Sequence, residues 1–182
     1  IIEKPFFLSV KPYQVDALYK LIRSKEGFEM PPLHSDQSQL NSVYQDSDIL
    51  QGVLTDGTPS FDSIPAGFLK GFIDLSFEYE DKYYILDYKT NFLQGNNAYS
   101  HDLLNNQMIK LSYDIQGHLY SLAMHKFLAT CKYNYSYQKH FGGYFYVFVR
   151  GLTTDNHTNG VHFYRPSEQR MKTMEVIVNG KQ

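Results

Sequence analysis

The sequence predicts a mixed α/β fold in which a central β-sheet is flanked by helices. One observation is the strand-like alternation of apolar residues between positions 67 and 90. Another is the helical spacing of apolar residues after Pro12 and again from Met108 to Thr130. A third is the uninterrupted apolar and aromatic run Tyr144–Val149, a pattern typical of a strand covered on both faces. Because strand and helix patterns alternate along the chain, we expect helices packed on one sheet.

The N-terminal region predicts a strand followed by a helix. Phe6–Val10 is expected to be a short strand, and Pro12 suits the first turn of a helix, where its missing N–H is not needed. The helix after Pro12 is supported by one apolar stripe at helical spacing, formed by Val15, Leu18, Tyr19 and Ile22. The later segment 34–64 is polar and rich in Ser, Asp and Gln, which predicts a long loop or an insertion.

Residues 67–90 are predicted to form a β-hairpin that turns at positions 80–81. A two-residue loop there pairs Tyr79 with Lys82, so that paired residue numbers add up to 161, and a four-residue loop centred at the same place gives the same register. Asp74 and Asp87 give the same sum, and we expect them opposite each other on one face, with Lys89 two positions further along.

The same hairpin predicts a metal site. Two carboxylates directly across a strand pair repel each other, and a divalent cation such as Mg²⁺ between them would reverse that penalty. The simpler interpretation is a solvated outer face, and spacing alone favours it. In both interpretations the opposite face is expected to be the buried one. That face carries the apolar residues Ile73, Leu75, Phe77, Tyr84, Leu86 and Tyr88.

The C-terminal half predicts a loop, a long helix and further sheet elements. Residues 91–106 are expected to be a loop, and Met108–Thr130 the longest helix. Gln116 and Tyr120 are four residues apart and therefore project from one side of that helix, where simple packing is the alternative to a functional role. The remaining expected elements are a strand at Val161–Tyr164 and a helix after Ser167.

Four segments resemble the C-terminal nuclease domain of RecB, the beta subunit of exodeoxyribonuclease V (RecBCD). The resemblance is dense from about Ala66 to Gly151 and implies a restriction-endonuclease-like core of the PD-(D/E)xK nuclease superfamily. The segments are Gly67–Leu75, Tyr83–Asn91, Tyr113–Tyr120 and His140–Gly151.

The resemblance implies a metal site that binds Mg²⁺, with Mn²⁺ or Ca²⁺ able to replace it in binding. Asp74 and Asp87 correspond to the metal-binding carboxylates, and the backbone carbonyl of Tyr88 and the side chain of Glu3 to further ligands. Relatives also carry a metal-binding histidine well before the acidic strand. The chain begins at Ile1, so that segment is expected to be missing, and His34 is in the wrong order to replace it.

The resemblance also implies catalytic roles and an activity. Lys89 corresponds to the catalytic lysine, and Gln116 and Tyr120 to the Gln-x-x-x-Tyr motif of RecB-type nucleases. The implied activity is a Mg²⁺-dependent DNA exonuclease and endonuclease in double-strand break repair. The implied partners are single- and double-stranded DNA ends, RecC-like and RecD-like subunits and a RecA-like recombinase. The alternative is a non-catalytic module for subunit docking or recombinase loading, which would be inert in this form.

Composition limits the other classes of protein. With 182 residues, the chain is expected to be a single nuclease domain, residues 1–182, and its non-methionine start suits a piece of a larger helicase–nuclease. The single Cys131 excludes an internal disulfide framework and a four-cysteine cluster. No signal peptide or membrane span is visible, and a bacterial cytoplasmic location is expected. The net charge of −2 is unusual for a free-standing DNA-binding protein.

Overall fold

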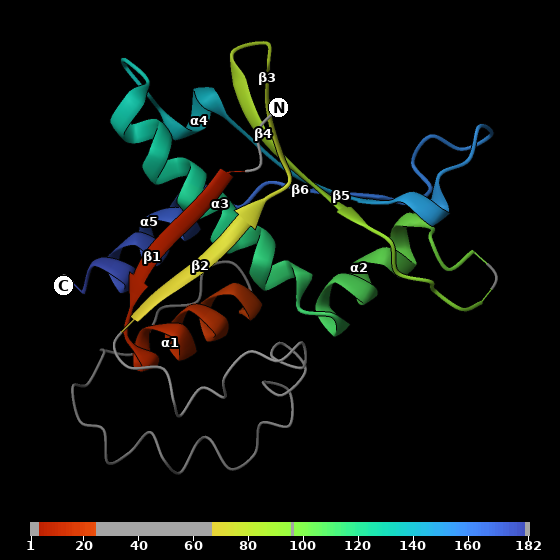
Figure 1. The fold of residues 1–182 in the computed structure, drawn as a ribbon, viewed down its shortest axis with the longest axis horizontal. Helices are drawn as coiled ribbons and strands as arrows, with labels where there is room; N and C mark the ends of the chain where they lie inside the picture. The colour runs from red at the N-terminus through yellow and green to blue at the C-terminus, as the bar shows by residue number, and fades with distance from the viewer. Residues whose placement is uncertain (1–3, 25–66, 96, 181–182) are drawn as a thin grey trace.

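The computed structural model describes residues 4–24, 67–95 and 97–180, so the predicted loop 34–64, Glu3 and His34 lie outside the described residues. The chain is a mixed α/β protein with a two-stranded sheet, a four-stranded sheet and flanking helices (Figure 1). The strands are β1 (Lys4–Val10), β2 (Gly67–Ile73), β3 (Leu75–Tyr79), β4 (Lys82–Lys89), β5 (Phe141–Phe148) and β6 (Val161–Tyr164). The helices are α1 (Pro12–Arg23), α2 (His101–Lys110), α3 (Tyr113–Cys131), α4 (Tyr137–His140) and α5 (Glu168–Asn179), and the 3-10 turn Val149–Gly151 follows β5.

The smaller sheet pairs β1 with β2 in antiparallel register, from Lys4 opposite Ile73 to Val10 opposite Gly67. The predicted strand and the helix that starts at Pro12 are both confirmed. The prediction of one hairpin over residues 67–90 is wrong in its first half, because the chain bends at Asp74 and β2 pairs with β1 instead. Hydrogen bonding to a distant strand thus overrides the local pattern.

The true hairpin is β3–β4, and its turn is the shorter of the two loops that the predicted register allows. Glu80 and Asp81 both adopt positive φ angles, 50° and 60°, as a tight turn matched to strand twist requires. Tyr79 pairs with Lys82, so the predicted register of the hairpin is confirmed from Leu75 onward. On its other side β4 pairs in parallel with β5, which places β4 inside the four-stranded order β3-β4-β5-β6.

The buried face of this sheet is the opposite of the one that the hydrophobic pattern predicted. Ile85 and Asp87 are only 1% and 3% exposed, and the cross-strand partners Tyr144 and Tyr146 are buried beside them. The helix α3 covers this face, because Gly117 lies directly against the Tyr144 ring. The predicted solvated face is therefore wrong, and Asp87 lies in the interior. The face expected to be the core is instead a half-exposed aromatic layer made by Phe77, Tyr84, Phe145 and Phe163.

Two predictions for the middle of the chain are also corrected. The predicted loop 91–106 ends early, because α2 begins at His101. The predicted single helix over Met108–Thr130 is two helices, since Ser112 adopts a left-handed φ of 56° between α2 and α3. The strand β6 and the helix α5 are confirmed, and the Ser167 side chain caps α5 by accepting from the backbone N–H of Arg170.

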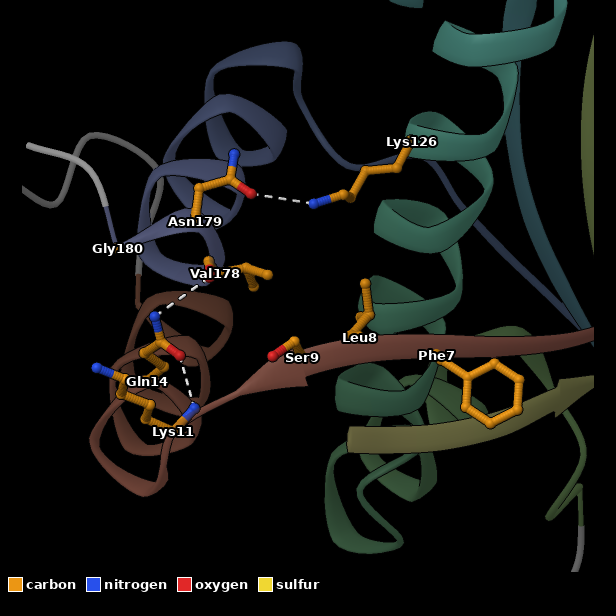
Figure 2. A pocket seen from close by; sticks show the side chains of 9 residues that line it. All are labelled: Phe7, Leu8, Ser9, Lys11, Gln14, Lys126, Val178, Asn179 and Gly180. Carbon is orange, nitrogen blue, oxygen red and sulfur yellow. Dashed lines mark hydrogen bonds between the residues drawn. The ribbon is translucent and has the colours of Figure 1, made fainter. Parts of the chain in front are cut away.

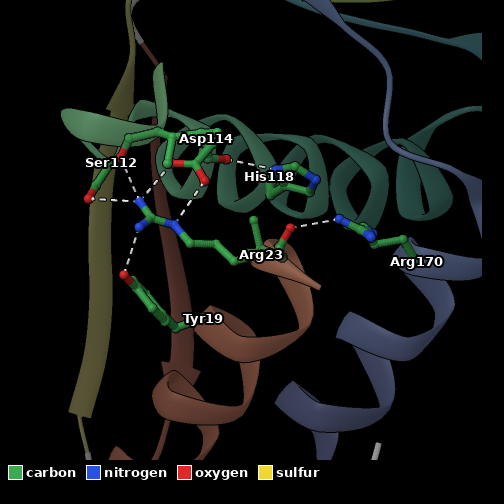
Figure 3. Close-up of polar contacts among 8 residues, drawn as sticks. Tyr19, Arg23, Ser112, Asp114, His118 and Arg170 are labelled. Atoms are coloured by element: carbon green, nitrogen blue, oxygen red, sulfur yellow. Dashed lines mark hydrogen bonds and ion pairs between the residues drawn. The ribbon is translucent and has the colours of Figure 1, made fainter. Parts of the chain in front are cut away.

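Two arginines, one partly buried and one buried, join the helices (Figure 3). Arg23, at the end of α1, donates from Nε and Nη2 to the Asp114 carboxylate at 3.1 and 3.2 Å. Arg170, on α5, donates to the carbonyls of Ile22 and Ser24 at 2.7 and 2.8 Å and so satisfies the C-terminal end of α1. These bonds connect α1 to both α3 and α5. No helix in the described part of the chain is long and apolar enough to span a membrane.

Candidate active site

The candidate site lies at the end of β4, on the buried side of the sheet. The Lys89 ammonium lies 2.7 Å from Oδ2 of Asp87, and it donates to Oε1 of Gln116 on α3 at 3.1 Å. It also lies over the rings of Tyr113 and Tyr146, at 4.2 and 5.0 Å from their centroids. Two aromatic faces, an amide oxygen and a carboxylate therefore hold one positive charge in place.

Asp74 lies at the bend between β2 and β3, next to the hairpin. Extending the hairpin register by one residue places it opposite Asp87. Its Oδ2 accepts a hydrogen bond from the backbone N–H of Tyr88 at 3.1 Å, while the residue remains exposed. The Tyr88 side chain is half exposed, so the residue contributes its backbone to this region. The structure therefore brings Asp74 and Asp87 to the same end of β4, one exposed and one buried.

Gln116 is the centre of a hydrogen-bond network. Its Oε1 accepts from the Tyr146 hydroxyl at 2.8 Å in addition to Lys89, and its Nε2 donates to the Tyr120 hydroxyl at 2.8 Å. The amide is thus used at both ends, which fixes its orientation. The predicted pair of Gln116 and Tyr120 does face the sheet, and together with Asp87 and Lys89 it forms one continuous polar chain.

Burial sets the electrostatics of the site. Burial raises the pKa of the Asp87 carboxyl, the adjacent Lys89 ammonium opposes that shift, and the Asp74 charge adds to it. Burial, with the nearby Asp87 charge, also raises the pKa of Tyr120 and of Tyr146. Both phenols therefore keep their protons at neutral pH and act as neutral hydrogen-bonding groups.

The carboxylates fit a hard divalent cation. Oδ2 of Asp87 is buried, and the Lys89 ammonium lies 2.7 Å from it. Asp74 uses one oxygen for the Tyr88 amide. Within the described ranges no group of three or more His, Cys, Asp or Glu side chains could hold a metal. Two carboxylates supplemented by water and substrate phosphate are the usual Mg²⁺ environment, so the donor set suits that ion better than zinc.

Two site residues were not predicted. Tyr146 and Tyr113 stack on each other with ring centroids 5.5 Å apart, beneath the Lys89 ammonium. Tyr146 lies in an uninterrupted run of apolar and aromatic residues, in which residue type alone does not show which side chains face the interior. Its position opposite Asp87 in the parallel register is the signal that would have identified it, and that register is not visible in the sequence.

Two hollows in the described part of the chain lie away from these residues. One of about 380 Å³ lies between β1, the start of α1 and the ends of α3 and α5 (Figure 2). There Gln14 donates to the carbonyls of Ile177 and Val178, and Lys126 donates to Asn179. A second hollow of about 450 Å³ lies between β1 and α3. None of the candidate site residues lines either one.

Comparisons with known proteins point to one subunit. No protein-family model matches the chain. The chain is 39% identical over 140 residues to the RecBCD enzyme subunit RecB of Buchnera aphidicola subsp. Schizaphis graminum, a match that covers 76% of this chain and 11% of that protein. It is 36% identical over 145 residues to RecB of Escherichia coli (strain K12), covering 79% of this chain and 12% of that protein. The chain therefore spans only about an eighth or less of these relatives.

Proposed function

Because the chain is homologous to a segment of the RecB subunit of RecBCD enzymes, we propose that it is a Mg²⁺-dependent DNase domain that hydrolyses phosphodiester bonds during double-strand break repair. The observation that supports this most strongly is the continuous chain of contacts from Asp87 through Lys89 and Gln116 to Tyr120. A carboxylate and an ammonium that are both largely removed from water carry a desolvation cost, and such arrangements are typical of functional sites. The proposed activity is both exonucleolytic and endonucleolytic.

Asp74 and Asp87 would hold the Mg²⁺, with the backbone carbonyl of Tyr88 as a further ligand and Glu3 as a candidate from outside the described residues. When bound, the ion polarises the scissile phosphodiester and lowers the pKa of an attacking water. The position of the Asp87 carboxylate and the exposed Asp74 carboxylate at the same end of β4 supports this assignment. Mn²⁺ is expected to replace Mg²⁺, and Ca²⁺ to bind.

Lys89 supplies the positive charge beside the phosphate. Its ammonium is fixed before substrate arrives, so little reorganisation is needed when negative charge develops on the phosphate oxygens or when a water is oriented. Gln116 holds that ammonium from α3, and Tyr120 holds the other end of the Gln116 amide. These two residues therefore act mainly by positioning Lys89.

The partners belong to the same proposal. The similarity to RecB suggests assembly with RecC-like and RecD-like subunits, action on DNA ends that a helicase supplies, and contact with a RecA-like recombinase in the bacterial cytoplasm. The net charge of −2 supports this arrangement, because a domain tethered to a DNA motor does not need a strongly basic surface of its own.

The proposal is tested by cleavage of linear double-stranded and single-stranded DNA with Mg²⁺ or Mn²⁺. Asp87→Asn and Lys89→Met are each expected to lower the rate by about 10²–10³-fold, the usual cost of removing one group that stabilises transition-state charge. The chain offers a matched control, because Asp81 at the turn of the hairpin and Lys132 at the end of α3 form an ion pair with the same 2.7 Å separation. Asp81→Asn and Lys132→Met should leave the rate unchanged.

Two outcomes would contradict the proposal. Cleavage that survives both site variants would place the reaction elsewhere in the chain. A folded chain that binds neither Mg²⁺ nor Mn²⁺ in calorimetry and cleaves no DNA would support the non-catalytic docking or recombinase-loading module instead.

A further inference from the structure

Phe92 is an exposed aromatic residue beside the candidate site. It follows Lys89 by three residues, and its side chain is 72% exposed. Leaving a phenylalanine in water forgoes roughly 1.5–3 kcal/mol of burial free energy. An aromatic ring in this position is therefore suited to contact a ligand that arrives from solution.

The backbone on both sides of Phe92 is firmly anchored. The Tyr99 hydroxyl accepts a hydrogen bond from the backbone N–H of Leu93 and donates one to the carbonyl of Asn91, each at 3.0 Å. The Tyr113 hydroxyl donates to the Asn91 side chain, also at 3.0 Å. The ring is thus held out on a fixed backbone, which lowers the entropic cost of stacking against a ligand.

Arg150 provides a positive charge on the neighbouring segment. Its Nε donates to the carbonyl of Thr90 at 2.9 Å, which fixes the guanidinium beside the end of β4. Among the described residues its two terminal nitrogens have no partner, and the side chain is exposed. Lys89 and Phe148 are partners in the parallel pairing of β4 with β5, so the segments that follow these two residues leave the sheet at the same end.

We propose that Phe92 and Arg150 form a binding subsite for single-stranded DNA next to the Asp87–Lys89 site. The Phe92 ring stacks on an unpaired base, and the Arg150 guanidinium binds a backbone phosphate. A base inside a duplex has both faces covered by its neighbours, whereas an unpaired base offers a free face to an aromatic ring. The statement that the bound strand is a substrate rests on the proposed nuclease function. Binding of the strand does not, since stacking requires no cleavage.

Base stacking can be measured directly, because the fluorescence of 2-aminopurine in a single-stranded oligonucleotide changes when the base stacks on a ring. The titration is done with EDTA, so that no strand is cut. We expect a saturable signal with the wild-type chain, a loss of affinity of roughly 5–100-fold for Phe92→Ala, and near wild-type affinity for Phe92→Trp. The affinity for a duplex of the same sequence should be the same for Phe92→Ala and for the wild-type chain.

Arg150→Gln separates the phosphate contact from the stacking contact. It is expected to weaken binding and to reduce the slope of log affinity against log salt by about one, whereas Phe92→Ala leaves that slope unchanged. Tyr133→Ala is the matched control, since Tyr133 is 89% exposed in the loop between α3 and α4. It should bind like the wild type.

The subsite is overturned if the wild-type chain gives no signal, if Phe92→Ala binds the single strand as the wild type does, or if Tyr133→Ala loses as much affinity. Because the titration contains no divalent cation, it is independent of the cleavage assay. If a base stacks on Phe92 but no cleavage depends on Lys89, only the nuclease proposal is contradicted. If cleavage depends on Lys89 but no base stacks on Phe92, only the proposed subsite is contradicted.

Discussion

Lys89 and Asp87 form an ion pair that is almost entirely removed from water, with side-chain exposures of 13% and 5%. The pair of Lys132 and Asp81 has the same separation, but the Asp81 side chain is 66% exposed. Taking two charges out of water is expensive, and removing one partner leaves the other buried and unpaired. The two ion pairs should therefore respond very differently to substitution.

Asp87→Asn is predicted to destabilise the fold by roughly 3–5 kcal/mol, because it leaves the Lys89 ammonium without its counter-charge. The double variant Asp87→Asn/Lys89→Met should recover most of that loss. Urea unfolding at neutral pH measures both. Asp81→Asn serves as the control and should have little effect, since exposed pairs contribute little. A double variant that is no more stable than the single one would contradict the burial argument.

Gln116→Met is predicted to reduce the DNA cleavage rate constant by about 10–100-fold, because Lys89 loses the amide oxygen that positions it. Tyr120→Phe keeps the ring and removes only one contact to that amide, so its effect should be smaller. The KM for DNA is expected to stay unchanged in both, as neither side chain is assigned to substrate binding. An equal loss in both variants, or a loss confined to KM, would be inconsistent with a positioning role.

Gly117→Ala tests the contact between α3 and the sheet. A Cβ at this position would collide with the Tyr144 ring, although alanine is the better helix former by about 1 kcal/mol. We predict a lower melting temperature and weaker cleavage, since Gln116 is the next residue. Thr130→Ala, at the exposed end of the same helix, is the control and should be neutral or slightly stabilising. A more stable Gly117→Ala chain would show that α3 can move away at no cost.

His118 is predicted to make the fold acid-sensitive. Burial lowers its pKa from 6.5 to about 4, and Nε2 has no hydrogen-bond partner while Nδ1 donates to the Asp114 carbonyl (Figure 3). Between pH 6.5 and about 4 the His118 imidazole binds a proton in the unfolded chain but not in the folded chain. The free energy of unfolding therefore falls as the pH drops through this range. The loss from this residue amounts to roughly 3 kcal/mol.

His118→Phe should flatten that limb of the stability profile, as measured by unfolding at a series of pH values. The exposed His157→Gln is the control and should keep the full slope. Burial also lowers the pKa of His162 to about 4, so part of the slope is expected to remain in the variant. A profile that is unchanged by His118→Phe would contradict the prediction.

Local patterns predicted those parts of the fold that depend on neighbouring residues. The tight turn at Glu80 and Asp81, the hairpin register and the helix that begins at Pro12 follow from side-chain period and turn chemistry, and all three are confirmed. The division of the hairpin region into β2 and β3 was not predictable, because it depends on the pairing of β2 with β1, which is distant in the sequence. The break at Ser112 likewise has no glycine or proline to announce it.

The candidate site shows the same limit. The sequence identified Asp74, Asp87, Lys89, Gln116 and Tyr120. The structure links the last four through short contacts and places Asp74 at the same end of β4, where it accepts from the backbone N–H of Tyr88, while the roles of all five remain predictions. The hydrophobic pattern assigned the wrong face of the hairpin to the core. Tyr84 and Leu86 have the side chains of core residues, but in the structure both are only partly buried. Tyr146 was missed because it meets the site only through the parallel pairing of β4 with β5.

The bend at Asp74 has a mechanical consequence. This residue is the junction between the β1–β2 ribbon and the hairpin, whereas Asp87 is fixed inside the four-stranded sheet. The gap between the two acids therefore depends on the angle at which the ribbon meets the sheet. We therefore expect a partner protein that binds the β1–β2 sheet to change the separation of the Asp74 and Asp87 carboxylates without contacting either residue.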